Sequence, residues 1–455
     1  MELMVLMSIL IKGLSSVLDL SSRAIITKYG SVEEFGSFTL YISIIEMLFF
    51  VFYSGMTKFN IYYGAQNVNL IPFKKKYYLY YAVPLVMLLF GVFYYLFGMI
   101  GLMLGALTTL YITYMDISSW LLANKLYFAS QFGEYFLGRV FFFAILLLLV
   151  VENCQINVIY LLSIQIIQYI VVFAFLGLVC YKVLPTIKKT LIEAEVGLTK
   201  LIDYQQSDFF HGIISYIPII IQYAALGAYD TGVLAVYMTF NRVITFLSGP
   251  TAKVFLPRFS EYFNMGNIKS IINDYNIIIK LQFSYLLIIS VFCIFNLDFL
   301  LSYFGDFKRH ISLLRSLCLI SILFTSLGPL NGFLQMISCE KEEKRIKLSS
   351  LLTFIMVILL FHKNSEFIFW GIIGQLFVEM SLLLFTTIRT IHRLPFDIAI
   401  YIWFIVELFL LLIESIVFEK YIDSYIFIIV IELISAVIIQ VYILKDDVLK
   451  YLKKS

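Results

Sequence analysis

Runs of about 20 apolar residues recur from one end of this chain to the other, and each is long enough for a helix to cross bilayer hydrocarbon. Hydrophobic residues make up 61% of the 455 residues, and charged residues only 14%. A water-soluble domain is closer to half apolar and a quarter charged. The sequence therefore predicts an all-α polytopic membrane protein.

We expect fourteen transmembrane helices, with a count of twelve as the alternative if two weak segments lie along the interface. The predicted spans are 4–26, 36–57, 77–97, 100–122, 134–151, 156–180, 209–228, 231–252, 281–300, 311–338, 347–361, 367–388, 398–418 and 424–444. The short connections leave no room for a soluble catalytic domain, so we expect a protein that is not an enzyme. No cysteine or histidine spacing and no nucleotide-binding loop indicates a metal or a cofactor.

Lysine and arginine are distributed unevenly between the two sides of these spans. With both termini inside, twenty-three of the 33 lie on the inner side, six on the outer side and four within spans. Because positive residues accumulate in cytoplasmic loops, we predict that both termini are cytoplasmic. The net charge of +3 is too small to indicate a nucleic-acid partner.

Two short patterns occur twice in the same order. GSFTLYIS at 36–43 resembles GVLAVYMT 196 residues later, and SGMTKF at 54–59 resembles SGPTAKVF 194 residues later. Such an offset places six spans onto six, which predicts two pseudo-symmetric six-helix bundles around a central cavity, a transporter design. The predicted divisions are an N-terminal bundle at 1–180, a cytoplasmic linker at 181–208, a C-terminal bundle at 209–388, and two additional helices with a cytoplasmic tail at 389–455.

One long inner connection, residues 253–280, has an amphipathic pattern. Amphipathic segments beside spans commonly lie along the membrane surface, so we expect this one at the inner interface. Pro218, inside the span 209–228, lacks a backbone N–H and is expected to act as a hinge.

Charged residues in the first predicted span share one helical face. Lys12 and Asp19 lie on it with Arg23 next to it. Charges are costly in hydrocarbon, so those retained usually face a cavity or a partner helix. Two turns separate Lys12 from Asp19, about 10 Å of rise, so these two are not expected to pair directly. Two interpretations of this face remain open: it lines a water-filled cavity, or it holds neighbouring helices together.

Further charges lie in the later spans. Arg242 is in the middle of 231–252, where a ligand phosphate or an ion pair with Glu46 or Asp116 would satisfy it. For Arg139, in 134–151, a ligand role, extension toward the interface and pairing with Glu134 remain open.

These residues make up the predicted site, a mixed-sign and slightly cationic cavity. The predicted head-group-binding residues are Lys12, Arg23, Arg139 and Arg242. The predicted cavity carboxylates, which would pair with them or couple an ion, are Asp19, Glu46 and Asp116. Such a cavity suits an amphiphile with an anionic head group better than a lipophilic cation.

The segment 227–262, GAYDTGVLAVYMTFNRVITFLSGPTAKVFLPRFSEY, resembles the Wzx-type O-antigen and polysaccharide-unit flippases of the multidrug/oligosaccharidyl-lipid/polysaccharide exporter superfamily. The residues that match the pattern of this family are Gly232, Tyr237, Arg242 and Pro257 in that segment, Gly30, Glu34, Phe35, Gly36 and Tyr41 near the N-terminus, the SGMT at 54–57 and the FGDF at 304–307.

The resemblance implies alternating access and transfer of an undecaprenyl-diphosphate-linked oligosaccharide from the inner to the outer leaflet of a bacterial inner membrane. It implies no covalent chemistry, and the expected partners are the lipid-linked glycan and membrane lipid. We expect a monomer, with polysaccharide polymerase and chain-length machinery as candidate partners. The alternatives are a multidrug or cation antiporter of the same superfamily, a lipid II flippase, and a membrane enzyme such as a glycan polymerase.

Overall fold

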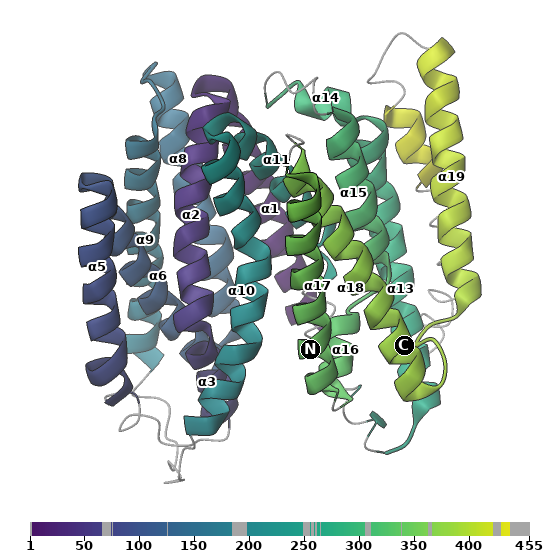
Figure 1. Cartoon of the computed structure of the whole chain (residues 1–455), viewed down its shortest axis with the longest axis horizontal. Helices are drawn as coiled ribbons and strands as arrows, with labels where there is room; N and C mark the ends of the chain where they lie inside the picture. The colour runs from purple at the N-terminus through teal and green to yellow at the C-terminus, as the bar shows by residue number, and fades with distance from the viewer. Residues whose placement is uncertain are drawn as a thin grey trace. The chain divides into compact units, whose positions relative to one another are not determined.

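The structure is a computed structural model in which every regular element of the described residues is a helix (Figure 1). The described residues are 2–65, 74, 76–124, 126–183, 198–248, 255, 259, 262–263, 265–304, 311–337, 339–362, 366–421 and 429–436. No strand occurs among them, and the predicted all-α class is confirmed. Pro257, residues 184–197 of the predicted linker and most of the predicted span 424–444 lie outside the described residues.

The chain forms two compact units, Met1–Ala235 and Val236–Ser455, and the boundary falls within one helix. Helices that begin in the first unit are α1 (Glu2–Tyr29), α2 (Val32–Phe52), α3 (Ser54–Ala65), η1 (Tyr78–Ala82), α5 (Val83–Phe97), α6 (Met99–Ala123), α7 (Tyr127–Gln131), η2 (Phe132–Leu137), α8 (Gly138–Val151), α9 (Val158–Val183), α10 (Leu198–Leu226) and α11 (Ala228–Ile244). Those of the second are α13 (Ile268–Ser290), η4 (Val291–Phe295), α14 (Leu297–Leu301), α15 (Ile311–Ser326), α16 (Leu330–Met336), α17 (Glu340–Phe361), α18 (Phe367–Ile391) and α19 (Ile398–Tyr421).

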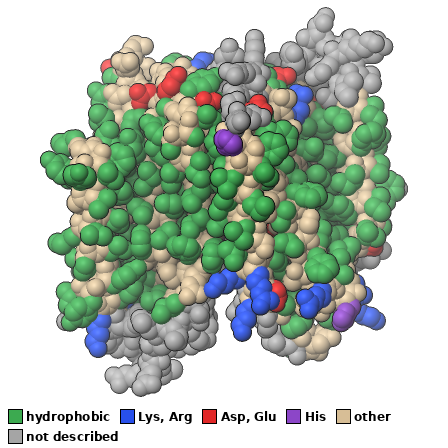
Figure 2. Space-filling model, in the orientation of Figure 1, with side chains coloured by type: hydrophobic (Ala, Val, Ile, Leu, Met, Phe, Trp, Pro, Cys, Tyr) green, Lys and Arg blue, Asp and Glu red, His purple; other side chains and the backbone are tan. Residues whose placement is uncertain are grey.

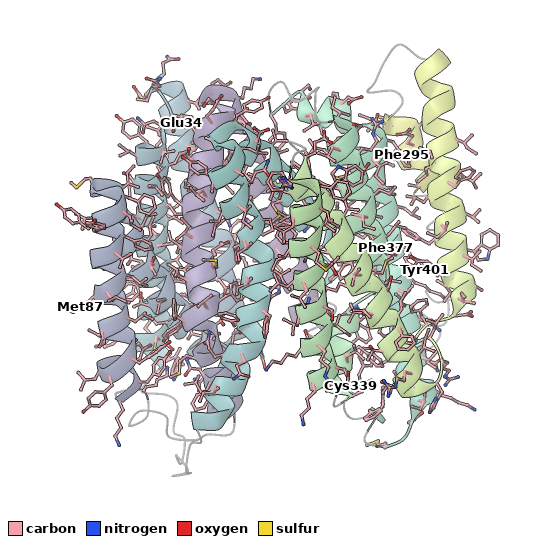
Figure 3. The ribbon with its side chains drawn as sticks, in the orientation of Figure 1. Glu34, Met87, Phe295, Cys339, Phe377 and Tyr401 are labelled. Atoms are coloured by element: carbon pink, nitrogen blue, oxygen red, sulfur yellow. The ribbon has the colours of Figure 1, made fainter. Side chains whose placement is uncertain are left out.

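Nine helices in the described part of the chain are long and apolar enough to cross a membrane. Large apolar side chains along them are exposed, as lipid-facing side chains would be: Tyr95 is 88% exposed, and Met87 points away from α5 (Figure 3). On the visible face, apolar side chains cover the middles of the helices, while lysine and arginine gather near the lower helix ends (Figure 2). The distribution is that of a multi-pass membrane protein.

The ends of the helices are held by short-range hydrogen bonds and by contacts between helices. Ser31 caps α2 by accepting a hydrogen bond from the Glu34 N–H at 3.1 Å. The Glu34 carboxylate, at the upper end of α2 in Figure 3, accepts a hydrogen bond from the Val158 N–H at 2.6 Å. Val158 begins α9, so an acidic side chain lies where the helix dipole is positive.

Glycines from the two copies of the repeated pattern pack against each other within the first unit. A Cβ on Gly36 would lie 2.7 Å from the Gly232 nitrogen and 2.0 Å from the Ala228 oxygen, and one on Gly232 would lie 2.3 Å from the Val32 oxygen. Val32 and Ala228 are separated by the same 196 residues as the two glycines. The contact is therefore reciprocal, as expected where two equivalent segments meet about a pseudo-two-fold axis.

Three helices have bounds that differ from those expected from the sequence. Of the expected amphipathic segment 253–280, residues 268–280 form the start of α13, bury Ile271 and Tyr275, and belong to the candidate membrane span 268–295. Residues 311–334 of the predicted span 311–338 form one candidate membrane span, although α15 and α16 divide within it, where Gly328 has a φ of +80° and Pro329 comes directly after it. In the predicted span 231–252, α11 ends at Ile244.

Candidate functional site

Asp19 is the centre of a charged cluster that joins α1 to α8 in the first unit. Its Oδ2 accepts a hydrogen bond from Arg23 Nε at 2.9 Å, and its Oδ1 lies 2.6 Å from Arg139 Nη1. Asp19 is ten residues before the end of α1, about 15 Å of helical rise, so the cluster lies well inside the helical span. The structure thus brings together three of the residues predicted for the site.

A π-helical segment, η2, ends two residues before Arg139 and leads into α8, the helix that carries it. A π-helix closes its hydrogen bonds over five residues, which inserts an extra residue and rotates the residues after it. Gly133 lies in η2 and Gly138 is the first residue of α8, and a Cβ at either would come within 2.8 Å of an α9 side chain. Ser15 of α1 donates a hydrogen bond to the Tyr135 carbonyl at 2.7 Å. The close packing on α9 and this hydrogen bond hold Arg139 toward α1.

Two of the cations in this region also contact aromatic rings. The Lys12 ammonium lies 4.7 Å from the centre of the Tyr135 ring, and the Arg23 guanidinium lies 5.7 Å from that of Phe35. Cation–π contacts of this kind hold a cation where the surroundings are partly desolvated. Lys12, Arg23, Arg139 and Asp19 carry a formal charge of +2 between them, and all four lie within the first unit.

The partner of Arg139 differs from the one suggested by sequence spacing. Glu134 accepts a hydrogen bond from Ser118 Oγ at 2.8 Å, and Arg139 pairs with Asp19 instead. Asp19 and Arg139 are 120 residues apart, and no local periodicity relates them. The Tyr135 carbonyl contact was also missed, because a π-helix has no simple sequence signal.

Asp116 belongs to a separate set of contacts in the first unit. Its carboxylate lies 3.0 Å from the Lys74 ammonium and accepts a hydrogen bond from Asn60. The carboxylate is seven residues from the end of α6, about 10 Å, where α3 packs on α6. Lys58 similarly pairs with Asp208 of α10. These pairs connect α3, α6 and α10, and Lys74 was not identified from the sequence because it lies between two predicted spans.

The remaining predicted residues lie at other places in the fold. Glu46 is half-buried on α2, and Pro218 is buried inside α10, whose helical structure continues through it. Arg242 is exposed in the last turn of α11 rather than in the middle of a span. The Tyr285 hydroxyl donates a hydrogen bond to the Val243 carbonyl at this helix end. A cation in the last turn also stabilises the helix dipole.

In the second unit, a buried ion pair joins α17 to α18. The Glu379 carboxylate accepts hydrogen bonds from the Lys347 ammonium and, at 3.2 Å, from Asn331 Nδ2 of α16. Its side chain is 3% exposed and that of Lys347 is 12% exposed. The pattern of charges alone did not assign a role to Glu379.

The fold is that of known membrane transporters. A lipid II flippase, MurJ in an inward closed conformation, matches with a TM-score of 0.65 and 12% identity over 96% of this chain and 99% of that one. An inward-facing multidrug resistance MATE family transporter of the MOP superfamily matches with a TM-score of 0.64 and 12% identity over 85% and 98%. An outward-facing MATE family transporter of the same superfamily matches at 0.59 and 13% over 85% and 95%. No protein-family model and no curated protein sequence matches this chain.

Proposed function

We propose that this protein is a flippase that moves an undecaprenyl-diphosphate-linked oligosaccharide, the repeat unit of a surface polysaccharide, from the inner to the outer leaflet. The observation that carries the proposal is the Asp19 cluster, in which two guanidinium groups converge on one carboxylate far from the helix ends. A guanidinium group can donate two parallel hydrogen bonds to the oxygens of a phosphate, so a diphosphate suits a site with two arginines.

In this mechanism, Asp19 occupies the guanidinium groups of Arg23 and Arg139 when no cargo is bound. An arriving diphosphate replaces the carboxylate as the acceptor, and Asp19 takes the arginines back when the cargo leaves. Lys12, on the same face of α1, adds attraction for the anionic head group. Arg242 is a second, separate contact for the head group in this proposal, Glu46 and Asp116 are proposed to couple an ion, and Pro218 is the proposed hinge.

The fold supports transport rather than chemistry on the cargo, because similar folds belong to proteins described as transporters and flippases. Alternating access across a bacterial inner membrane, with both termini cytoplasmic, is part of the same proposal. The energy source is an ion gradient or the membrane potential. Glycan polymerase and chain-length machinery are proposed partners of a monomeric flippase.

A lipid II flippase is the second candidate, and one observation favours it. The similarity to MurJ extends over 96% of this chain, whereas the similarity to the MATE transporter extends over 85%. The difference is about a tenth of the chain, so the chain resembles MurJ in extent as well as in fold. Lipid II also carries a diphosphate, and the Asp19 cluster would suit either cargo.

Reconstitution tests the proposal directly. Vesicles containing the full chain are loaded with a fluorescent undecaprenyl-diphosphate-linked oligosaccharide, and the fraction of glycan that becomes accessible to an added glycosidase is followed over time. Loss of the Arg139 guanidinium removes a charge-assisted contact worth about 1.5–3 kcal/mol, so Arg139→Ala should slow transfer by roughly 10- to 100-fold.

The matched control is Arg345→Ala, because Arg345 pairs with Glu342 on the surface of α17 and should not affect transfer. Equal transfer by Arg139→Ala and the wild type would remove the Asp19 cluster from the cargo path. Parallel vesicles containing labelled lipid II, and others containing a cationic dye, separate the three cargo classes. Transfer of lipid II alone would establish the second candidate, and movement of the dye alone would indicate an antiporter.

A further inference from the structure

A cavity of about 500 Å³ lies at one end of the first unit, between the start of the third span and the start of α10. Its lining is largely aromatic and aliphatic and includes Tyr77, Tyr80, Tyr81, Leu201 and Ile202. Volumes of this size are typical of sites for small organic ligands. Tyr80 is 76% exposed, so an apolar molecule in this cavity would cover aromatic surface that is otherwise open.

The break between α2 and α3 fixes the walls of the cavity. Carbonyls that a continuous helix would satisfy are bonded instead by side chains from outside it, since unpaired backbone groups are costly near hydrocarbon. Gln205 of α10 donates to the carbonyls of Phe50 and Val51 at 2.6 and 2.7 Å, and Tyr77 donates to that of Phe52 at 3.3 Å. These hydrogen bonds attach both walls of the cavity to the end of α2, so the cavity is formed before a ligand binds.

The cavity lies where three candidate spans end or begin. One span ends at Phe52, another begins at Tyr78, and a third begins at Asp208. Tyrosine is enriched at this depth, where its ring faces hydrocarbon and its hydroxyl faces the head groups. The excess of lysine near these helix ends predicts that this end faces the cytoplasm.

The charge of the lining selects among lipids. Lys76 is exposed and is the charged residue of the lining. The carboxylate of Asp116 lies 3.0 Å from the Lys74 ammonium, so its charge is balanced by another lysine. We propose that this cavity binds an anionic phospholipid of the inner leaflet, with an acyl chain against the tyrosines and the phosphate at Lys76.

This proposal goes beyond the flippase function and does not depend on it. The cavity is built from η1, α10 and the end of α2, whereas the proposed cargo cluster joins α1 to α8. Lipid binding here can therefore be present or absent whichever cargo the protein moves. Its test uses binding alone, so its failure is distinguishable from failure of the transport assay.

Native mass spectrometry of the purified full chain in detergent measures the binding. The protein is titrated with phosphatidylglycerol or with phosphatidylethanolamine of the same acyl chains. We expect one phosphatidylglycerol to bind in preference to phosphatidylethanolamine. A lysine near a membrane surface attracts an anionic lipid by about 1 kcal/mol, so Lys76→Gln should weaken phosphatidylglycerol binding about fivefold and leave phosphatidylethanolamine unchanged.

Two further variants separate the cavity from general surface attraction. Ile202→Trp fills the cavity and should reduce binding of both lipids, while Leu348→Trp, an exposed position on α17, should not. Lys341→Gln, an exposed lysine at the start of α17, is the control for Lys76→Gln. Equal affinities for the two lipids would overturn the proposal. So would phosphatidylglycerol binding that is unchanged in either Lys76→Gln or Ile202→Trp. Displacement of phosphatidylglycerol by an equal concentration of polyprenyl phosphate would assign the cavity to a carrier lipid and also overturn it.

Discussion

Each of the two units contains a carboxylate that pairs with a basic side chain of another helix, but the two clusters differ in balance and exposure. Glu379 in the second unit faces one ammonium and an amide, and its side chain is 3% exposed. Asp19 in the first unit faces two guanidinium groups, and its side chain is 13% exposed. Arg139 is more open still, at 30%.

The difference separates a structural pair from a site that can exchange partners. Burial makes a balanced pair costly to break, because either partner alone would be an uncompensated charge. A carboxylate shared between two arginines can lose one contact and keep the other. The Glu379 pair therefore suits holding α17 to α18, and the Asp19 cluster suits temporary release of an arginine to an anionic ligand.

The largest expected effect is on stability, at the Glu379 pair. Lys347→Met should lower the free energy of unfolding by about 3–5 kcal/mol, because it leaves a buried carboxylate without its cation. Thermal unfolding in detergent, followed by the loss of the monodisperse peak in size-exclusion chromatography, measures the change. The double variant Lys347→Met/Glu379→Leu should recover most of the loss. A melting temperature of Lys347→Met equal to that of the wild type would contradict a structural role.

The next effect should be on binding, at Asp19. Asp19→Asn removes the acceptor that competes with a diphosphate for two arginines, and we expect a cost in stability of about 1–2 kcal/mol. The affinity for undecaprenyl diphosphate should rise several-fold, while transfer slows because release is slower. Tryptophan fluorescence titration with the lipid measures the affinity. If Asp19 only held helices together, the variant would lose stability without binding more tightly.

A smaller effect should result from a change that keeps the charge of Arg139. Arg139→Lys retains the cation but loses the planar fork, so transfer should fall by about 3- to 10-fold, or roughly 1 kcal/mol. Arg315→Lys is the matched control, since Arg315 lies 3.6 Å from Asp298 and both side chains are partly exposed. The vesicle assay measures both. Equal losses in the two variants would mean that the geometry of Arg139 has no special role.

The sequence predicted the helical class and the approximate positions of the spans because a bilayer imposes both a length and a composition on each helix. It also placed Lys12 and Asp19 on one face of α1, since that depends only on helical periodicity. The sequence showed that Gly36 and Gly232 occupy matching positions of a repeated pattern, but it did not predict that they touch. Their close approach required the structure, because the sequence gives no distance between helices.

The partners of the charged residues were less predictable. Arg139 pairs with Asp19 across 120 residues and follows a π-helical segment that the sequence did not predict, whereas sequence spacing pointed to Glu134. Asp116 pairs with Lys74, which lies between two predicted spans, where no helical periodicity was assigned. The break of α11 after Ile244 moved Arg242 from the middle of a span to a helix end. Each of these depends on local backbone geometry or on contacts over a long sequence separation.

The smallest effect is expected where an ion pair is both balanced and exposed, and it sets the baseline for the comparison of Asp19 with Glu379. Arg345 lies 2.9 Å from Glu342 one turn away on α17, and its side chain is 74% exposed. Water screens such a pair, so Arg345→Ala should change stability by no more than about 0.5 kcal/mol. The difference in melting temperature between Arg345→Ala and the wild type should also stay small from about 50 mM to 500 mM salt, a range over which the Debye length falls about threefold. A loss as large as that of Lys347→Met would show that burial does not decide the strength of these pairs, and the distinction between the two clusters would lose its physical basis.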